Sequence, residues 1–153
     1  MLENLQNNHV GIHTFVFAKN VIRTIKDMIG VSFILNENSF HQAPFSSNFH
    51  FIAYIHFAGA IEGDYLLSLD EILAIKLIDA YEDGMSDDDI REMRGDYGDF
   101  IKELLNTAVG ISIIELEQTF GNLTYSSCVL VYGEIEFPDI STGNIKIKEK
   151  NGE

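Results

Sequence analysis

Cysteine is almost absent from this chain. The one cysteine, Cys128, lies in the short apolar run Ser-Cys-Val-Leu-Val at 127–131. A cysteine in such a run is more typical of a small buried hydrophobe than of a nucleophile or a disulfide partner. We therefore expect Cys128 to be buried and chemically inert.

Basic residues are also scarce. Lysine and arginine together number 10, against 24 aspartates and glutamates, which gives a formal net charge of −14 at pH 7. Nucleic acids and anionic membranes carry charge of the same sign, so neither would attract this protein. A partner protein with a basic patch would be attracted.

Long apolar runs are missing as well, since none approaches the ~20 residues needed to cross a bilayer. The first eight residues, MLENLQNN, hold no basic stretch followed by an apolar one, so we expect no secretory signal and a cytoplasmic location. With 153 residues, 46% of them hydrophobic, we expect a single domain over residues 1–153. Glycine-rich phosphate loops, catalytic triads and metal clusters are not found, which disfavours an enzyme with a small-molecule pocket.

Three stretches place apolar residues at helical spacing. The first covers residues 15–29, and we expect it to end at Gly30, because glycine readily adopts the left-handed backbone of a helix C-cap. The second begins at a capping box and ends near residues 83–84. A third, long helix is expected from residue 86 to Gly110. The capping box consists of Ser68 and Glu71, and the buried stripe expected after it consists of Ile72, Ile75, Leu77 and Ile78.

Aromatic and β-branched residues predict strands elsewhere in the chain. The expected strands are 31–35, 49–58, 65–69, 111–116, 125–132, 133–137 and 144–150. The strands before and after Gly59 should form a hairpin, whereas residues 36–48 carry turn formers and a proline and should form a loop. The sequence therefore predicts an α+β domain of two layers, with helices packed on one face of a mostly antiparallel sheet.

A degenerate internal repeat is also expected. Residues 29–33, Ile-Gly-Val-Ser-Phe, match residues 109–113, Val-Gly-Ile-Ser-Ile, and each set follows a helix and precedes a hairpin. Gly30 and Gly110 would then occupy equivalent places.

The third helix separates an apolar side from a polar side. At about 100° per residue, the polar side gathers Asp99, Glu103, Asn106 and Gly110. The side opposite, expected to face the core, consists of Ile101, Leu104, Leu105, Ala108 and Ser112. Glu103 and Asn106 are neighbours one turn apart, and they form our candidate site. On pattern alone, a solvated helix face without a function is the better interpretation.

This polar side resembles the motif of the CheX/CheC/FliY family, phosphatases that act on the chemotaxis response regulator CheY. In the family motif an Asp or Ser precedes a Glu by four positions, and an Asn follows three positions later. Asp99, Glu103 and Asn106 fit this motif, and Gly110 follows as in CheX-like members. Residues 51–69 and the helix after them also resemble the family. The family motif also includes a proline further along the chain. The family spacing would place it at residue 129, where this chain has Val129 and so departs from the motif. This chain holds one copy of the motif rather than two, which makes it similar to CheX rather than CheC. The fold that the resemblance implies is CheC-like.

The resemblance implies a hydrolase that accelerates loss of the aspartyl phosphate from a phosphorylated CheY-like response regulator. Asn106 suits the positioning of the attacking water, because an amide can accept from water and donate to a phosphoryl oxygen at once. Glu103 would dock on the regulator's active-site lysine. Asp99, Lys102 and Thr107 are expected to contact the partner. The Mg²⁺ belongs to the regulator, so we expect no cofactor or metal in this chain.

Other interpretations remain open at this point. A non-catalytic binding or assembly module, as in flagellar-switch relatives, is the main alternative function. Metal binding is disfavoured, because His50 and His56 lie too far apart along one strand, and the aspartates at 87–89 lack the alternating ligands of a calcium loop. A homodimer is expected from the CheX-like resemblance and from an edge strand at 144–150 with alternating lysines, which would equally guard that edge against aggregation.

Overall fold

Helices form at the three places where apolar residues recur at helical spacing. The computed structural model describes residues 9–47, 51–83, 98–132 and 135–150, and within these ranges the helices are α2 (His9–Ile29), α3 (Glu71–Glu82) and α5 (Gly98–Phe120). Helix α2 ends as predicted. Gly30 has φ +74°, and its N–H donates to the carbonyl of Lys26 at 2.9 Å, the arrangement of a glycine C-cap.

Helix α3 starts two residues later than its predicted capping box. The N-cap is Asp70, whose side chain accepts from the N–H of Leu73 at 2.7 Å, while Ser68 belongs to the preceding strand. The predicted buried stripe is half wrong. Ala74, Leu77 and Ile78 are buried, but Ile72 and Ile75 are 83% and 49% exposed. Residues three and four apart share one face of a helix, and the face of α3 that packs on the core carries residues 74, 77 and 78.

Helix α5 runs ten residues past its predicted end. Gly110 lies inside it, and the predicted strand 111–116 is helical. Ile113 and Leu116 are buried and continue the apolar stripe. Full burial of such a side chain contributes about 1.5–3 kcal/mol, more than the ~1 kcal/mol that a glycine costs a helix. Gly121, at φ +90°, follows the last helical turn instead. The predicted equivalence of Gly30 and Gly110 is therefore wrong, and the internal repeat is not shown.

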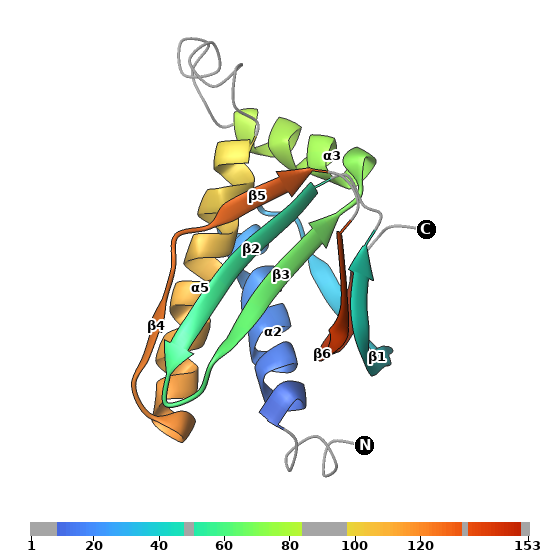
Figure 1. Cartoon of the computed structure of the whole chain (residues 1–153). Helices are drawn as coiled ribbons and strands as arrows, with labels where there is room; N and C mark the ends of the chain where they lie inside the picture. Colours follow the sequence, from blue (N-terminus) through green and yellow to red (C-terminus); the bar gives the residue numbers. More distant parts are fainter. Residues whose placement is uncertain (1–8, 48–50, 84–97, 133–134, 151–153) are drawn as a thin grey trace.

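The larger sheet contains the predicted hairpin. Strands β2 (Phe51–Gly59) and β3 (Gly63–Leu69) pair antiparallel, and β2 also pairs antiparallel with β4 (Leu123–Tyr125) and β5 (Val129–Tyr132). Helices α2 and α5 lie side by side behind this sheet, and α3 crosses one end of it (Figure 1). The layer of helices on an antiparallel sheet is thus as predicted.

A second, two-stranded sheet was not predicted. Strands β1 (Phe33–Ser47) and β6 (Ile135–Glu149) pair antiparallel, so the expected loop at 36–48 is largely a strand. The prolines occupy the irregular part of this pair. The pairing register changes between Pro44 and Phe45 of β1, so residues 138–140 of β6 have no pairing partner on β1. Proline has no N–H for a ladder and fits such a position.

The core lies between α2, α5 and the larger sheet. Ala53, Ile55 and Phe57 of β2 alternate inward and are buried against the helices. A buried hydrogen bond joins the two long helices, in which Asn20 Nδ2 donates to Ser112 Oγ at 3.1 Å. This contact and the buried apolar stripe of α5 agree on which side of the helix faces inward.

Candidate functional site

The two sides of α5 are as the sequence predicted. All five residues expected to face the core are buried, namely Ile101, Leu104, Leu105, Ala108 and Ser112. On the opposite side Asp99 and Glu103 are exposed, and Asn106 and Gly110 are half-buried. Glu103 and Asn106 are one turn apart in the N-terminal half of the 23-residue helix, so their side chains reach the same patch of surface.

Tyr81, at the end of α3, flanks Glu103. Its hydroxyl lies 3.5 Å from Glu103 Oε2, at the outer limit of a hydrogen bond, and its ring packs on Phe100 with centroids 4.6 Å apart. Burial raises the pKa of Tyr81, and the nearby charge of Glu103 adds to the effect. The sequence analysis missed this residue, although its spacing from Leu77 and Ile78 places it on the buried side of α3.

The three expected partner-contact residues surround the pair unevenly. Asp99 and Thr107 are exposed, and Lys102 is half-buried. Burial raises the pKa of the Cys128 thiol, and a backbone hydrogen bond with Tyr54 and the positive charge of Lys102 oppose that rise. Cys128 is half-buried rather than fully buried, is free, and packs against the core.

Gly110 allows β4 to approach the exposed side of α5. A Cβ at this position would lie 3.1 Å from the hydroxyl oxygen of Tyr125, closer than ordinary contact. The N–H of Leu123 donates to Glu117 Oε1 at 2.9 Å, so β4 returns along α5 after the turn at Gly121. The tyrosine ring thereby lies beside the helix, one turn from Asn106.

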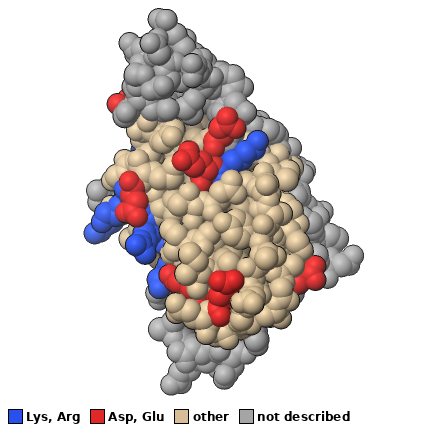
Figure 2. Space-filling model, turned by 90° about the vertical axis from the view of Figure 1, so that its left-hand side faces the viewer, with Lys and Arg blue, Asp and Glu red and all other residues tan. Residues whose placement is uncertain are grey.

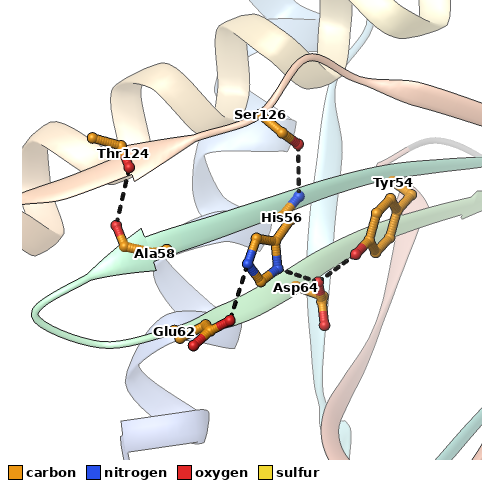
Figure 3. A network of polar contacts seen from close by, with 7 residues as sticks. All are labelled: Tyr54, His56, Ala58, Glu62, Asp64, Thr124 and Ser126. Carbon is orange, nitrogen blue, oxygen red and sulfur yellow. Dashed lines mark hydrogen bonds and ion pairs between the residues drawn. The ribbon is translucent and has the colours of Figure 1, made fainter.

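A second polar cluster lies on the outer side of β2 and β3, away from α5 (Figure 3). Asp64 Oδ1 accepts from Tyr54 Oη at 2.6 Å and lies 2.8 Å from His56 Nδ1, while Glu62 Oε1 lies 3.2 Å from His56 Nε2. The hydrogen bond with Asp64 raises the pKa of Tyr54 to about 12 and is the largest cause of a raised pKa of His56. Of this cluster, the sequence pointed only to His56, and only as a possible metal ligand.

Metal-ligand geometry is not found in the part of the chain that the structure describes. There, no group of three or more His, Cys, Asp or Glu side chains is placed to hold an ion. His50 and Asp87–Asp89, which were weighed as ligands, lie outside the described residues. Among the described helices, none combines the length and apolar character that would span a membrane.

Comparison with known proteins identifies the fold. No protein-family model matches the sequence, and no curated protein matches it. Solved structures of CheX and CheC-like proteins do match over nearly the whole chain. CheX from Desulfovibrio desulfuricans has 16% sequence identity and a TM-score of 0.73, covering 92% of this chain and 93% of that one. This chain has the fold of CheX.

Two further structures share the CheX fold. A protein from Desulfovibrio vulgaris Hildenborough assigned to chemotaxis has a TM-score of 0.76 at 16% identity, covering 95% of this chain and 93% of that one. A chain of the CheX–CheY–BeF₃–Mg²⁺ complex from Borrelia burgdorferi has a TM-score of 0.56 at 17% identity, covering 90% and 98%. At these identities the likeness extends to the fold alone.

Proposed function

We propose that this protein accelerates hydrolysis of the aspartyl phosphate of a CheY-like response regulator. One observation carries the proposal: Glu103 and Asn106 stand side by side on the outward side of α5 in a chain with the fold of CheX. The same fold occurs in a CheX–CheY complex, which supports a regulator as the partner.

Asn106 is the residue that we assign to the attacking water. Hydrolysis of an aspartyl phosphate is a loose in-line displacement, so catalysis depends mainly on positioning and electrostatic order. The amide of Asn106 can accept from the water and donate to a phosphoryl oxygen. Because it carries no charge, it does not repel the anionic phosphate. Its half-buried position on a long helix restricts the side chain before the partner arrives.

Glu103 is the residue that we assign to docking. A carboxylate near a phosphoryl group is repelled unless a cation lies between them, and the resemblance to the family implies that this cation is the regulator's active-site lysine. Tyr81, with its hydroxyl 3.5 Å from Glu103 Oε2, limits where the carboxylate can turn. Glu103 therefore contributes to association more than to the displacement itself.

The remaining parts of the reaction belong to the regulator. The aspartyl phosphate, the lysine and the Mg²⁺ would all arrive with it. Asp99, Lys102 and Thr107, which lie on or beside the same side of α5, are the further contacts that we propose. The exposed position of Glu103 suits this division, because a projecting side chain can enter a partner's pocket.

The test is loss of aspartyl phosphate from a panel of phosphorylated response regulators, measured with and without this protein. The proposal predicts faster loss from at least one regulator. Binding to a phosphorylated regulator without faster loss would instead favour a non-catalytic binding or assembly module. Asn106→Ala measured alongside separates catalysis by this chain from a contaminating phosphatase.

A further inference from the structure

An uncharged surface continues the candidate site along α5. Figure 2 faces the side of the molecule where β4 and α5 lie, and it shows a broad area without charged side chains between an upper group, which holds acidic residues and a basic one, and a lower acidic group. Residues 103, 107, 110 and 114 fall within a narrow arc of the helix at about 100° per residue. The polar side therefore becomes apolar at Ile114.

Two large apolar side chains are exposed on these elements, Ile114 on α5 and Tyr125 on β4. Ile114 is 65% exposed and Tyr125 is 45% exposed, and Gly110, one helical turn before Ile114, leaves room for the tyrosine hydroxyl. We name these three residues the α5 shelf. Exposed apolar groups that adjoin a functional site commonly mark a surface for a protein partner.

The shelf lies within reach of any protein docked on Asn106. Eight residues of helix separate Asn106 from Ile114, which is about 12 Å at 1.5 Å per residue. A standard interface buries about 800 Å² on each partner, equivalent to a disc of roughly 16 Å radius. An interface centred on Asn106 would therefore cover Ile114.

Charge gives a reason for an apolar contact here. The chain carries a formal net charge of −14, and the phosphorylated pocket that Glu103 and Asn106 would enter is itself anionic, so the two would repel each other at long range. Apolar burial does not depend on the sign of either charge. It would supply affinity while Glu103 and Asn106 supply register and chemistry.

We propose that the α5 shelf binds an apolar side chain of the phosphorylated response regulator, about 12 Å from its phosphoaspartate. This inference rests on the proposed function for the identity of the partner. The shelf sets which regulators bind, and it contributes to association and not to the displacement at phosphorus.

The test compares two exposed isoleucines. Ile114→Ala removes the shelf side chain, and Ile72→Ala is its matched control, since Ile72 is 83% exposed on α3 and lies outside the shelf. Both substitutions introduce a good helix former at an exposed site, so neither should unfold the protein. Ile114→Leu keeps an apolar side chain and should rescue.

Two measurements separate this inference from the proposed function. The first is the rate of phosphate loss against regulator concentration, which gives KM and kcat. The second is Kd for the same regulator loaded with beryllofluoride and Mg²⁺, which requires no catalysis. We expect Ile114→Ala to raise KM and Kd about ten-fold, as loss of an apolar interface anchor commonly does, with kcat within two-fold.

Equal Kd values for Ile114→Ala, Ile72→Ala and the wild type would overturn the shelf and leave the proposed function standing. The reverse result is a wild type that binds a loaded regulator without accelerating phosphate loss. In that case the proposed function is wrong, but a Kd that is higher for Ile114→Ala than for the wild type and Ile72→Ala still supports the shelf. A wild type that binds no loaded regulator overturns both.

Discussion

Asn106 is the side chain on which the proposed chemistry depends most. If it orders the water in the transition state, Asn106→Ala should lower kcat by roughly 100- to 1,000-fold, the usual cost of losing one well-placed polar group, and leave Kd nearly unchanged. Single-turnover decay of phosphorylated regulator measures the rate. Glu115→Ala, an exposed change on α5 away from the pair, is the control. Full activity in Asn106→Ala would remove the residue from the mechanism.

Glu103 should respond differently to the same change. If Glu103 docks on the regulator's lysine, Glu103→Ala leaves that lysine without its partner, so we expect Kd and KM to rise by about ten-fold or more, depending on how dry the contact is. Rising salt should narrow the gap between wild type and variant, because exposed charge pairs are screened. An unchanged Kd at low salt would contradict the docking role.

His56 gives a pH dependence with a defined sign. Its pKa is raised above 6.5 in the folded protein, chiefly by the hydrogen bond with Asp64, so the folded state favours the protonated ring. The stabilisation is full below about pH 6.5 and is lost as pH rises through the raised folded pKa. The difference in unfolding free energy between wild type and His56→Gln should therefore be larger at pH 5.5 than at pH 8.5.

Urea unfolding at both pH values checks this prediction. Groups that titrate identically in the two proteins cancel in the difference, which isolates the histidine. In an Asp64→Asn background the effect of pH should shrink. A difference that grows toward high pH would show that His56 is held neutral.

Residue-level prediction from sequence succeeded where helical periodicity decides the outcome. The inward and outward sides of α5 follow from spacing alone, so Glu103 and Asn106 could be placed correctly. Tyr81 and Tyr125 could not, because each reaches α5 from another element, α3 or β4. Such contacts depend on how elements pack, and no local pattern reports them.

At the scale of elements, the cap of α3 is a direct test of the observed helix start. Asp70→Ala removes the acceptor for the N–H of Leu73 and should lower the free energy of unfolding by about 1 kcal/mol. Asp79→Ala removes an exposed acid within the same helix without touching the cap. Urea denaturation of both variants should show a loss in the first only, whereas equal losses would assign the effect to charge.

Element boundaries were predicted poorly for two physical reasons. Gly110 predicts a helix end, but the buried stripe continues through Leu116 and outweighs the cost of one glycine. Turn formers and proline at 36–48 predict a loop, but pairing with β6 satisfies the backbone of most of this segment. Pairing between strands that are far apart in the sequence leaves no local signal in either strand. Where a partner strand is present, its pairing outweighs the turn propensity of the residues.

Whole-molecule association is the next prediction. We expect a homodimer, because the β1–β6 sheet has two strands and β6 carries lysines at alternating positions in a strongly acidic chain. Sedimentation equilibrium at micromolar concentration should then give twice the chain mass of 17.2 kDa. A mass near 17.2 kDa across a dilution series would count against the dimer and would assign the lysines to protection of the edge.

The pairing of β1 with β6 also has a consequence for biosynthesis. It joins Phe33 to Glu149, so β1 leaves the ribosome long before its partner exists. Until β6 is made, β1 presents unpaired backbone groups to other chains. Closing so long a stretch of polypeptide is slow compared with forming a hairpin. Nascent chains stalled between the two strands should therefore be the form most dependent on chaperones.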